Sequence, residues 1–350
     1  FKFTAAILLL LIPTMAMGAT FPVMAAILVR QQHTMGARIS ELYSLNTMGA
    51  VLGAALSGFV FIPAWGLDGA IYIAIAANFS VALTVWWLTR YRATSLALPP
   101  LTASSERKQI GYFHSPEMQA RTLFVLFATG FVAISCEVGW TKYLSIFTGT
   151  TIYGLSAILA IFLFGIALGS WAVRGILQRV THLEQWLGAG LLVLAVSLLL
   201  TRVALTTVPV AFAAFNHLDL SDAAIHFFKY ALVFVLLIMP TVLFGALFPL
   251  NLQLYCGNVK GVRERIGKAY AVNTLAGILG ALAAGFWAIP RFGTDAVLTF
   301  GAIFLLCAAM LYIAEFPERR RRVAFATVAA ITLVLSLSFF LQGRPVARCP

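Results

Sequence analysis

The stretch YAVNTLAGILGALAAGFWAIPRFG, residues 270–293, is a second copy of YSLNTMGAVLGAALSGFVFIPAWG, residues 43–66. The two copies align without a gap at an offset of 227 residues (270 − 43), which places Tyr270 on Tyr43. Solenoid repeats recur at roughly 20 to 50 residues. The much longer offset therefore indicates a duplicated unit of several helices, as in transporters that are built from internal repeats.

The composition predicts an all-α polytopic membrane protein. Of the 350 residues, 61% are hydrophobic and 10% are charged, and the mean hydropathy is +0.94. This is more apolar than an ordinary soluble globular protein. Apolar runs of about 20 residues, the length that a helix needs to cross a bilayer, recur between charged loops. The lipid bilayer is therefore an expected partner.

The net charge of +12 is interpreted as an orientation signal. Most Lys and Arg residues lie in alternate short loops, at 30–38, 90–121, 174–179, 260–268 and 319–322. Basic loops of this kind face the cytoplasm, so we expect a protein of the bacterial inner membrane with both ends of this chain on the outer side. A nucleic-acid partner is not expected, because that would require basic residues on one water-exposed face.

We expect about ten transmembrane helices in two parallel repeats, a plan close to the major facilitator fold. The first repeat is incomplete: residues 1–90 hold the three helices of its second half, and three more are expected before Phe1. A cytoplasmic linker at 91–121 leads to a complete second repeat of six helices at 122–314. An additional transmembrane helix at 323–341 and a tail at 342–350 follow. The expected spans are 3–29, 43–62, 67–88, 122–147, 152–173, 186–205, 228–254, 269–289, 295–313 and 323–341.

Glu137 is the leading candidate for a ligand-binding residue, because it lies near the middle of the apolar helix GFVAISCEVGWTKYLSIF. A charged side chain at the bilayer centre costs about 2.5 to 3.5 kcal/mol on insertion scales, so it is expected to face protein or a watery cavity and to have a partner. Lys142 follows five residues later and is the nearest candidate. Two interpretations remain open: a cation or proton site, and a structural role, either as a buried pair or as a carboxylate capped by Tyr and Thr hydroxyls.

Repeated polar residues form a second set of binding candidates. Tyr43 and Asn46 recur as Tyr270 and Asn273. Equivalent residues of two repeats can face each other across the axis that relates them, where transporter sites lie. The alternative is a helix-to-helix hydrogen bond, which is worth about 0.6 kcal/mol on average.

Small residues and prolines are expected to have structural roles. Glycine ridges let membrane helices approach closely, so packing is the default interpretation and gating an untested addition. Prolines at matching positions of both repeats are predicted to break or kink two helices, and interrupted helices at matching positions point to a cavity. These residues are Gly49, Gly53, Gly165, Gly169, Gly280, Pro13, Pro22, Pro240 and Pro249.

Motifs for cofactors, metals and catalysis are missing from the sequence. It contains no glycine-rich dinucleotide or phosphate loop, no His/Cys cluster and no Ser/His/Asp set. The four cysteines lie far apart and form no C-x-x-C pair. We therefore expect no cofactor, no metal and no catalytic residue within this chain.

The chain resembles the membrane part of the fused major-facilitator/spermidine synthase proteins. The resemblance is carried by PTMAMGATFP and PTVLFGALFP, by the two Y-x-x-N-T segments, and by GFVAISCEVGWTKYLSIF with the following FLFGIALGS. In such proteins a soluble aminopropyltransferase-like domain follows the membrane helices. The resemblance implies a polyamine or related amine as ligand, although Lys142 stands where that family leads us to expect Arg.

Three functions follow as alternatives. The first is a transporter-like domain in which Glu137 handles a polyamine or another small organic cation, because a carboxylate and the aromatic faces of Tyr and Trp suit a cation. The second is a structural subunit or anchor without transport, bound to other membrane subunits. The third is the anchor of an aminopropyltransferase whose catalytic domain is not in this chain.

Overall fold

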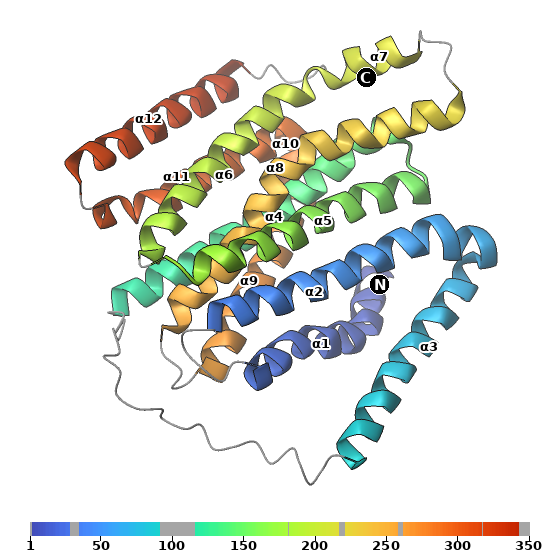
Figure 1. Cartoon of the computed structure of the whole chain (residues 1–350). Helices are drawn as coiled ribbons and strands as arrows, with labels where there is room; N and C mark the ends of the chain where they lie inside the picture. Colours follow the sequence, from blue (N-terminus) through green and yellow to red (C-terminus); the bar gives the residue numbers. More distant parts are fainter. Residues whose placement is uncertain are drawn as a thin grey trace.

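The computed structural model describes residues 2–28, 35–91, 116–180, 182–216, 221–257, 262–316 and 318–342. Helices alone make up its regular secondary structure over these residues, as Figure 1 shows. The prediction of an all-α membrane protein is confirmed at this level. The helices are α1 (Lys2–Leu28), α2 (Met35–Leu56), η2 (Ser57–Phe61), α3 (Ile62–Tyr91), α4 (Pro116–Thr148), α5 (Ile152–Leu177), α6 (Leu183–Leu205), α7 (Val208–Asn216), α8 (Asp222–Cys256), α9 (Val262–Leu282), η3 (Ala283–Ala288), α10 (Ile289–Phe292), α11 (Thr294–Met310), η4 (Ile313–Glu315) and α12 (Arg319–Gln342).

Seven of the described helical runs are long and apolar enough to cross a membrane, against the ten spans predicted. The difference arises from how the chain is divided. The run Met35–Arg90 counts once although it contains two of the predicted spans, because helical structure continues from α2 through η2 into α3. α11, Thr294–Met310, is shorter than a full span, and α1 enters this count only through Leu11–Ala25, although the helix covers Lys2–Leu28.

The main hydrophobic core lies among α4, α5, α6, α8, α11 and α12. Its largest fully buried side chains include Trp140, Phe162 and Leu198. The helix pairs with the most extensive packing are α5 with α8, α2 with α5, α4 with α9, and α6 with α11. Helices α4, α5, α6, α8 and α11 thus share one packed core, to which α12 contributes Phe325 and Ala329.

The N-terminal helices join this bundle mainly through α2, which packs along α5. Serine residues line the contact: the Ser44 hydroxyl donates to the Ala167 carbonyl at 2.9 Å, and Ser40 and Ser170 each donate to the other's carbonyl. Hydroxyl hydrogen bonds and small side chains of this kind hold membrane helices together at short range. Glu41 of α2 adds an ion pair with Arg174 of α5 at 3.7 Å.

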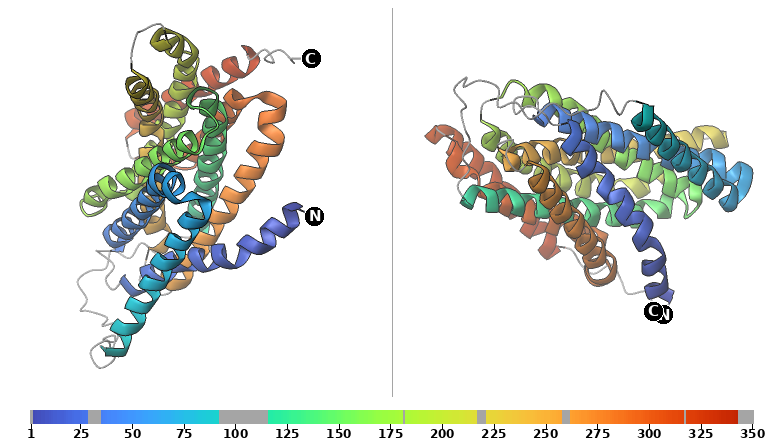
Figure 2. Two further views of the ribbon diagram at one scale, coloured as in Figure 1. Left: turned by 90° about the vertical axis from the view of Figure 1, so that its right-hand side faces the viewer. Right: turned by 90° about the horizontal axis from the view of Figure 1, so that it is seen from below.

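α1 and α3 are much less enclosed. The N-terminal half of α1 leaves the bundle in both views of Figure 2, and its Leu9 and Ile12 are each 78% exposed. In α3, Leu67 is 64% and Phe79 is 69% exposed, and Figure 1 shows this helix diverging from the rest. Large apolar faces of the first unit are therefore open to the surroundings.

The two sequence copies also share local backbone features. Both contain a π-helical turn, Ser57–Phe61 in the first copy and Ala283–Ala288 in the second, and the offset of 227 residues superimposes the two. Beyond each turn a glycine with positive φ interrupts the helical backbone: Gly66, at a kink within α3, has φ 71°, and Gly293, between α10 and α11, has φ 82°. Only glycine adopts this conformation without strain, so both copies turn sharply at the same place.

The prolines were predicted to break or kink their helices, and the helices are not broken there; a kink at these positions stays a prediction. α1 continues through Pro13 and Pro22, and α8 continues through Pro240 and Pro249. A proline removes one backbone donor and leaves the carbonyl four residues earlier without its partner. For Pro240 that carbonyl belongs to Leu236, and the Thr201 hydroxyl of α6 lies 3.4 Å from it, although the shorter hydrogen bond of this hydroxyl, at 2.9 Å, goes to the Ser197 carbonyl of α6. The irregular turns occur instead at the π-helical segments, which contain no proline.

Several predicted loop boundaries are also wrong. The basic loop expected between the spans 3–29 and 43–62 is helical from Met35 onward, and α9 begins at Val262 instead of Ala269. Hydropathy detects only the apolar part of a helix, whereas these helices continue into polar segments whose apolar residues, such as Met35 and Ile39, are buried. α7 was not predicted. Most of the linker at 91–121 and nearly all of the tail at 342–350 lie outside the described residues.

Candidate functional site

Glu137 lies within α4, two turns beyond the point where this helix meets Asn273 of α9. It is partly exposed, and the residues before it, Ser135 and Cys136, are buried. None of the ion pairs found among the described residues includes Glu137. The structure therefore presents a carboxylate on an apolar helix with no protein cation beside it in the described part of the chain.

Lys142 does not form the predicted pair with Glu137. Five residues along an α-helix correspond to a rotation of about 140°, so the two side chains leave the helix in different directions. Lys142 is exposed, and it takes part in no ion pair among the described residues. The charge of Glu137 is thus left for another partner.

Tyr43 and Tyr270 lie in one aromatic cluster with the repeat-related residues Phe21 and Phe248. The ring centroids of Tyr43 and Phe248 are 4.6 Å apart, and those of the equivalent pair Tyr270 and Phe21 are 5.1 Å apart. Within each copy, Phe21 and Tyr43 are separated by 5.7 Å and Phe248 and Tyr270 by 6.5 Å. The tyrosine of each copy therefore contacts the phenylalanine of the other copy, as expected where two equivalent units meet.

The two asparagines have different surroundings. Asn273 lies against α4, where a Cβ atom placed on Gly130 would be 2.6 Å from its Oδ1 atom. Asn46, at the equivalent position of α2, is exposed. No hydrogen bond joins the two amides in the described part of the chain, so the structure does not bring them together as one site.

Glu137 and the tyrosines do not share a binding site either. α4 and α9 run in the same direction, because Gly130 meets Asn273 and Val138 meets Gly285. Tyr270 lies about one turn before the first contact and Glu137 lies about two turns after it. The rise of 1.5 Å per residue then separates them by about 15 Å along the bundle. The carboxylate and the aromatic cluster therefore lie at two different levels along the bundle axis.

The glycines predicted to pack helices divide into two groups. A Cβ atom on Gly165 or Gly169 would overlap Thr241 or Val242 of α8, and one on Gly280 would overlap the Phe131 carbonyl of α4. At Gly49 and Gly53 a Cβ atom would meet nothing within 4 Å. Three of the five glycines therefore lie at close helix contacts, whereas the two in α2 face open space.

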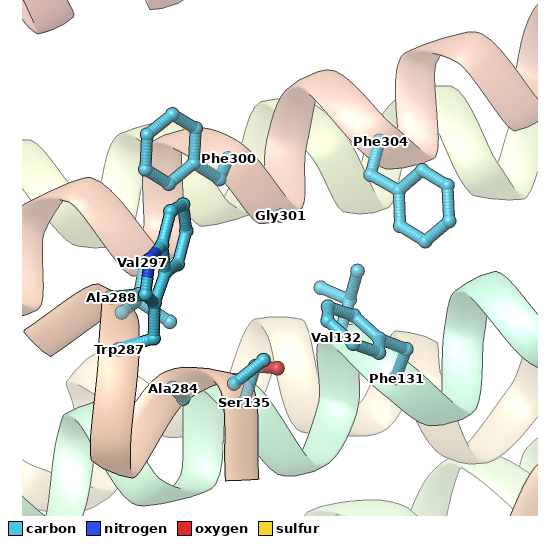
Figure 3. A pocket seen from close by; sticks show the side chains of 11 residues that line it. Phe131, Val132, Ser135, Ala284, Trp287, Ala288, Val297, Phe300, Gly301 and Phe304 are labelled. Atoms are coloured by element: carbon cyan, nitrogen blue, oxygen red, sulfur yellow. The ribbon is translucent and has the colours of Figure 1, made fainter. Parts of the chain in front are cut away.

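An apolar pocket of about 250 Å³ lies where α4, η3 and α11 meet. Figure 3 shows the rings of Trp287, Phe300, Phe304 and Phe131 around it. Of the lining side chains only Ser135 and Trp287 carry a polar atom, and the Ser135 hydroxyl already donates to the Gly280 carbonyl at 3.1 Å. The pocket suits an apolar group, and none of its lining side chains carries a charge.

Sequence reasoning did not find this pocket. Its signal would have been the spacing of Phe300, Gly301 and Phe304, in which a glycine lies between two rings on one side of α11. That spacing is also common in ordinary helix packing, and only the π-helical turn of η3 places Trp287 opposite the gap.

Metal binding has no visible basis in the described residues, which contain no group of three His, Cys, Asp or Glu side chains able to hold an ion. The chemistry that the site offers is therefore one carboxylate, a layer of aromatic rings and an apolar pocket.

The comparisons with known proteins do not identify a family, since no family model, no curated protein and no solved structure matches this chain.

Proposed function

We propose that this chain is a transporter-type membrane domain of major-facilitator-like plan, in which Glu137 binds a small organic cation. The observation that carries the proposal is the carboxylate of Glu137 within the apolar helix α4, with no ion-pair partner among the described residues. Charged groups inside membrane helices are costly and are kept where a ligand, an ion or a proton needs them.

The relation between the two sequence copies supports the plan of two parallel repeats. Their π-helical turns and positive-φ glycines coincide at the offset of 227 residues. Their aromatic residues meet in reciprocal pairs, Tyr43 with Phe248 and Tyr270 with Phe21. In transporters built from repeats, substrates bind between the repeats and the two units rock against each other. The cluster of Phe21, Tyr43, Phe248 and Tyr270 would then close one end of the interface between the two repeats.

Ion pairs between helix ends support the proposed orientation. Glu41, near the start of α2, forms ion pairs with Arg38 of the same helix and with Arg174 near the end of α5. Arg121, near the start of α4, pairs with Glu315 of η4 at 3.5 Å. These helix ends adjoin the basic segments that we assign to the cytoplasmic side of an inner membrane.

Spermidine is the first ligand to test, because the chain resembles proteins that carry a spermidine synthase-like domain. We expect spermidine to raise the melting temperature of the purified chain in detergent in a saturable manner. A ligand at 100 times its Kd stabilises the folded state by about 2.7 kcal/mol. The Glu137→Gln variant keeps the shape of the side chain and loses its charge, and it should lose this shift.

Glu117→Gln is the matched control, because Glu117 belongs to the same helix and its side chain is 82% exposed. This variant should keep the full response to spermidine, as should Lys142→Gln. An unchanged spermidine response in Glu137→Gln would remove the role assigned to this carboxylate. Loss of the response in Glu117→Gln as well would indicate a nonspecific charge effect and would also count against it.

A structural subunit is the second candidate, and the exposure of α3 favours it. Its apolar side chains Leu67, Tyr72 and Phe79 are 64%, 71% and 69% exposed. Lipid can cover such a helix, and so can other membrane chains. Spermidine-independent co-purification of a stoichiometric membrane partner, together with no ligand response in the unmodified chain, would favour this candidate over transport.

A further inference from the structure

The apolar pocket between α4, η3 and α11 is elongated along the bundle. Trp287 and Phe300 lie at one end of it, and Phe131 and Phe304 lie at the other, as Figure 3 shows. Val297 and Phe304 of α11 both line the pocket. They are seven residues apart, which corresponds to about 10 Å along the helix. A cavity of this shape suits an extended apolar chain.

The pocket runs in the direction of the helices that cross the membrane. Gly139 of α4 lies against Val297 of α11, and Val132 of α4 lies against Gly301 of α11, so α11 runs opposite to α4. α9 runs in the same direction as α4, and the turn between α10 and α11 therefore lies at one end of the bundle. The pocket begins near this turn and extends toward the middle of α11.

Exposed aromatic residues surround the end of the pocket near the turn. Trp287 is 48% exposed, and Phe286 beside it in η3 is 74% exposed. The ring of Phe292, which is 45% exposed, lies 5.4 Å from that of Trp287. In membrane proteins tryptophan is enriched at the level of the lipid headgroups. A lipid chain can therefore reach the pocket from the surface of the bundle.

A single cation lies beside this end of the pocket. Arg291 is exposed, and its guanidinium carbon is 5.7 Å from the centre of the Trp287 ring. None of the ion pairs found among the described residues includes Arg291, nor do they include Asp295, the acidic residue nearest to it in the sequence. A guanidinium group can donate two parallel hydrogen bonds to a phosphate. Its position and charge thus suit an anionic headgroup.

We infer that the pocket and Arg291 together bind one anionic phospholipid, with an acyl chain in the pocket and the phosphate at Arg291. Trp287 belongs to both parts, because its ring lines the pocket and also lies beneath the guanidinium group. The charged head is then at the end of the bundle and the chain points toward its middle, as in the bilayer itself. A free phosphate would leave the pocket unused, and an uncharged apolar ligand would leave Arg291 unused.

Photolabelling tests this inference with the whole chain in phosphatidylcholine nanodiscs. The probe is a phosphatidylglycerol with a diazirine midway along one acyl chain, and the reference is a phosphatidylcholine with the same chains. One surface cation strengthens the binding of an anionic lipid about fivefold. Peptide mass spectrometry should therefore find about five times more anionic than zwitterionic label on the peptide that contains Phe304. Around Val334 of α12, which is 63% exposed, the two lipids should label equally.

Variants of Arg291 test the headgroup contact, and its exposure means that they should fold. Arg291→Gln should remove the preference for the anionic lipid and leave labelling by the reference lipid unchanged. Arg291→Lys keeps the charge and should keep most of the preference. The matched control is Lys229→Gln, because Lys229 also lies over an aromatic ring, 5.7 Å from the centre of Phe212, but Phe212 does not line the pocket. This variant should keep the full preference.

Ala283→Phe tests the pocket, because Ala283 lines it and a phenyl ring would occupy its space. Labelling of the Phe304 peptide by both lipids should be lost in this variant, with size-exclusion chromatography as the check on folding. Excess inorganic phosphate should not displace the anionic probe, because it has no chain.

The inference is wrong if both lipids label the Phe304 peptide equally in the unmodified chain, or if Arg291→Gln retains the preference. Displacement of the probe by inorganic phosphate would also contradict it, since the site would then bind an anion without a chain. The experiment uses no amine and leaves Glu137 unchanged. Its failure is therefore distinguishable from a failure of the proposed cation binding.

Discussion

We expect the Gly169→Leu variant to lose the folded bundle in detergent, with a destabilisation of about 3 kcal/mol or more. A Cβ atom at position 169 would overlap the backbone carbonyl of Val242 on α8, and one on Gly245 of α8 would overlap the carbonyl of Ile166 on α5. The two helix backbones thus touch through glycines on both sides. Overpacking a close contact typically costs about 1 to 3 kcal/mol, and more where backbone has to move. Thermal unfolding followed by size-exclusion chromatography measures the loss.

Gly175→Leu is the matched control, because Gly175 lies on the same helix, is exposed, and would place its Cβ atom at least 4 Å from any neighbour. The expected change in stability is within about 0.5 kcal/mol, as for most surface substitutions. Equal effects of the two variants would show that glycine contributes here through backbone conformation alone. Close packing of α5 on α8 would then not be what position 169 requires.

The sequence predicted the helices well because apolar runs of about 20 residues leave few other structures for a chain in a membrane. It also predicted that Tyr43 and Tyr270 belong together, because a repeat places equivalent residues at equivalent positions. The structure places them in one cluster with Phe21 and Phe248. Helix ends were predicted less accurately, since Met35–Glu41 combines polar residues with buried apolar ones.

Other features depend on contacts that no pattern in one sequence specifies. Asn46 and Asn273 stand in the same motif, yet only Asn273 lies against another helix. The prolines were predicted to interrupt their helices, but the helix assignment continues through all four of them. Lys142 does not pair with Glu137, because side chains five residues apart leave an α-helix in different directions.

The Gly280→Leu and Gly53→Leu variants are expected to differ by about 3 kcal/mol although the two glycines occupy the same position of the repeated motif. At Gly280 a Cβ atom would overlap the Phe131 carbonyl and would lie 2.9 Å from the Ser135 hydroxyl oxygen, whereas at Gly53 nothing lies within 4 Å. Overpacking therefore applies only at position 280, and removal of the glycine backbone flexibility within a helix slightly favours both leucines. The measurement is the thermal midpoint of each purified variant.

Ser135→Ala separates the loss of a hydrogen bond from the loss of space at this contact. Its hydroxyl donates to the Gly280 carbonyl, and such bonds between membrane helices are worth about 0.6 kcal/mol on average. A large effect of Ser135→Ala would mean that the hydrogen bond, and not the close approach of the backbones, holds α4 on α9.

If Gly53→Leu were as destabilising as Gly280→Leu, the face of α2 that carries Gly53 would have to be packed against another part of the chain. The two glycines would then have similar surroundings despite the difference seen between the two helices.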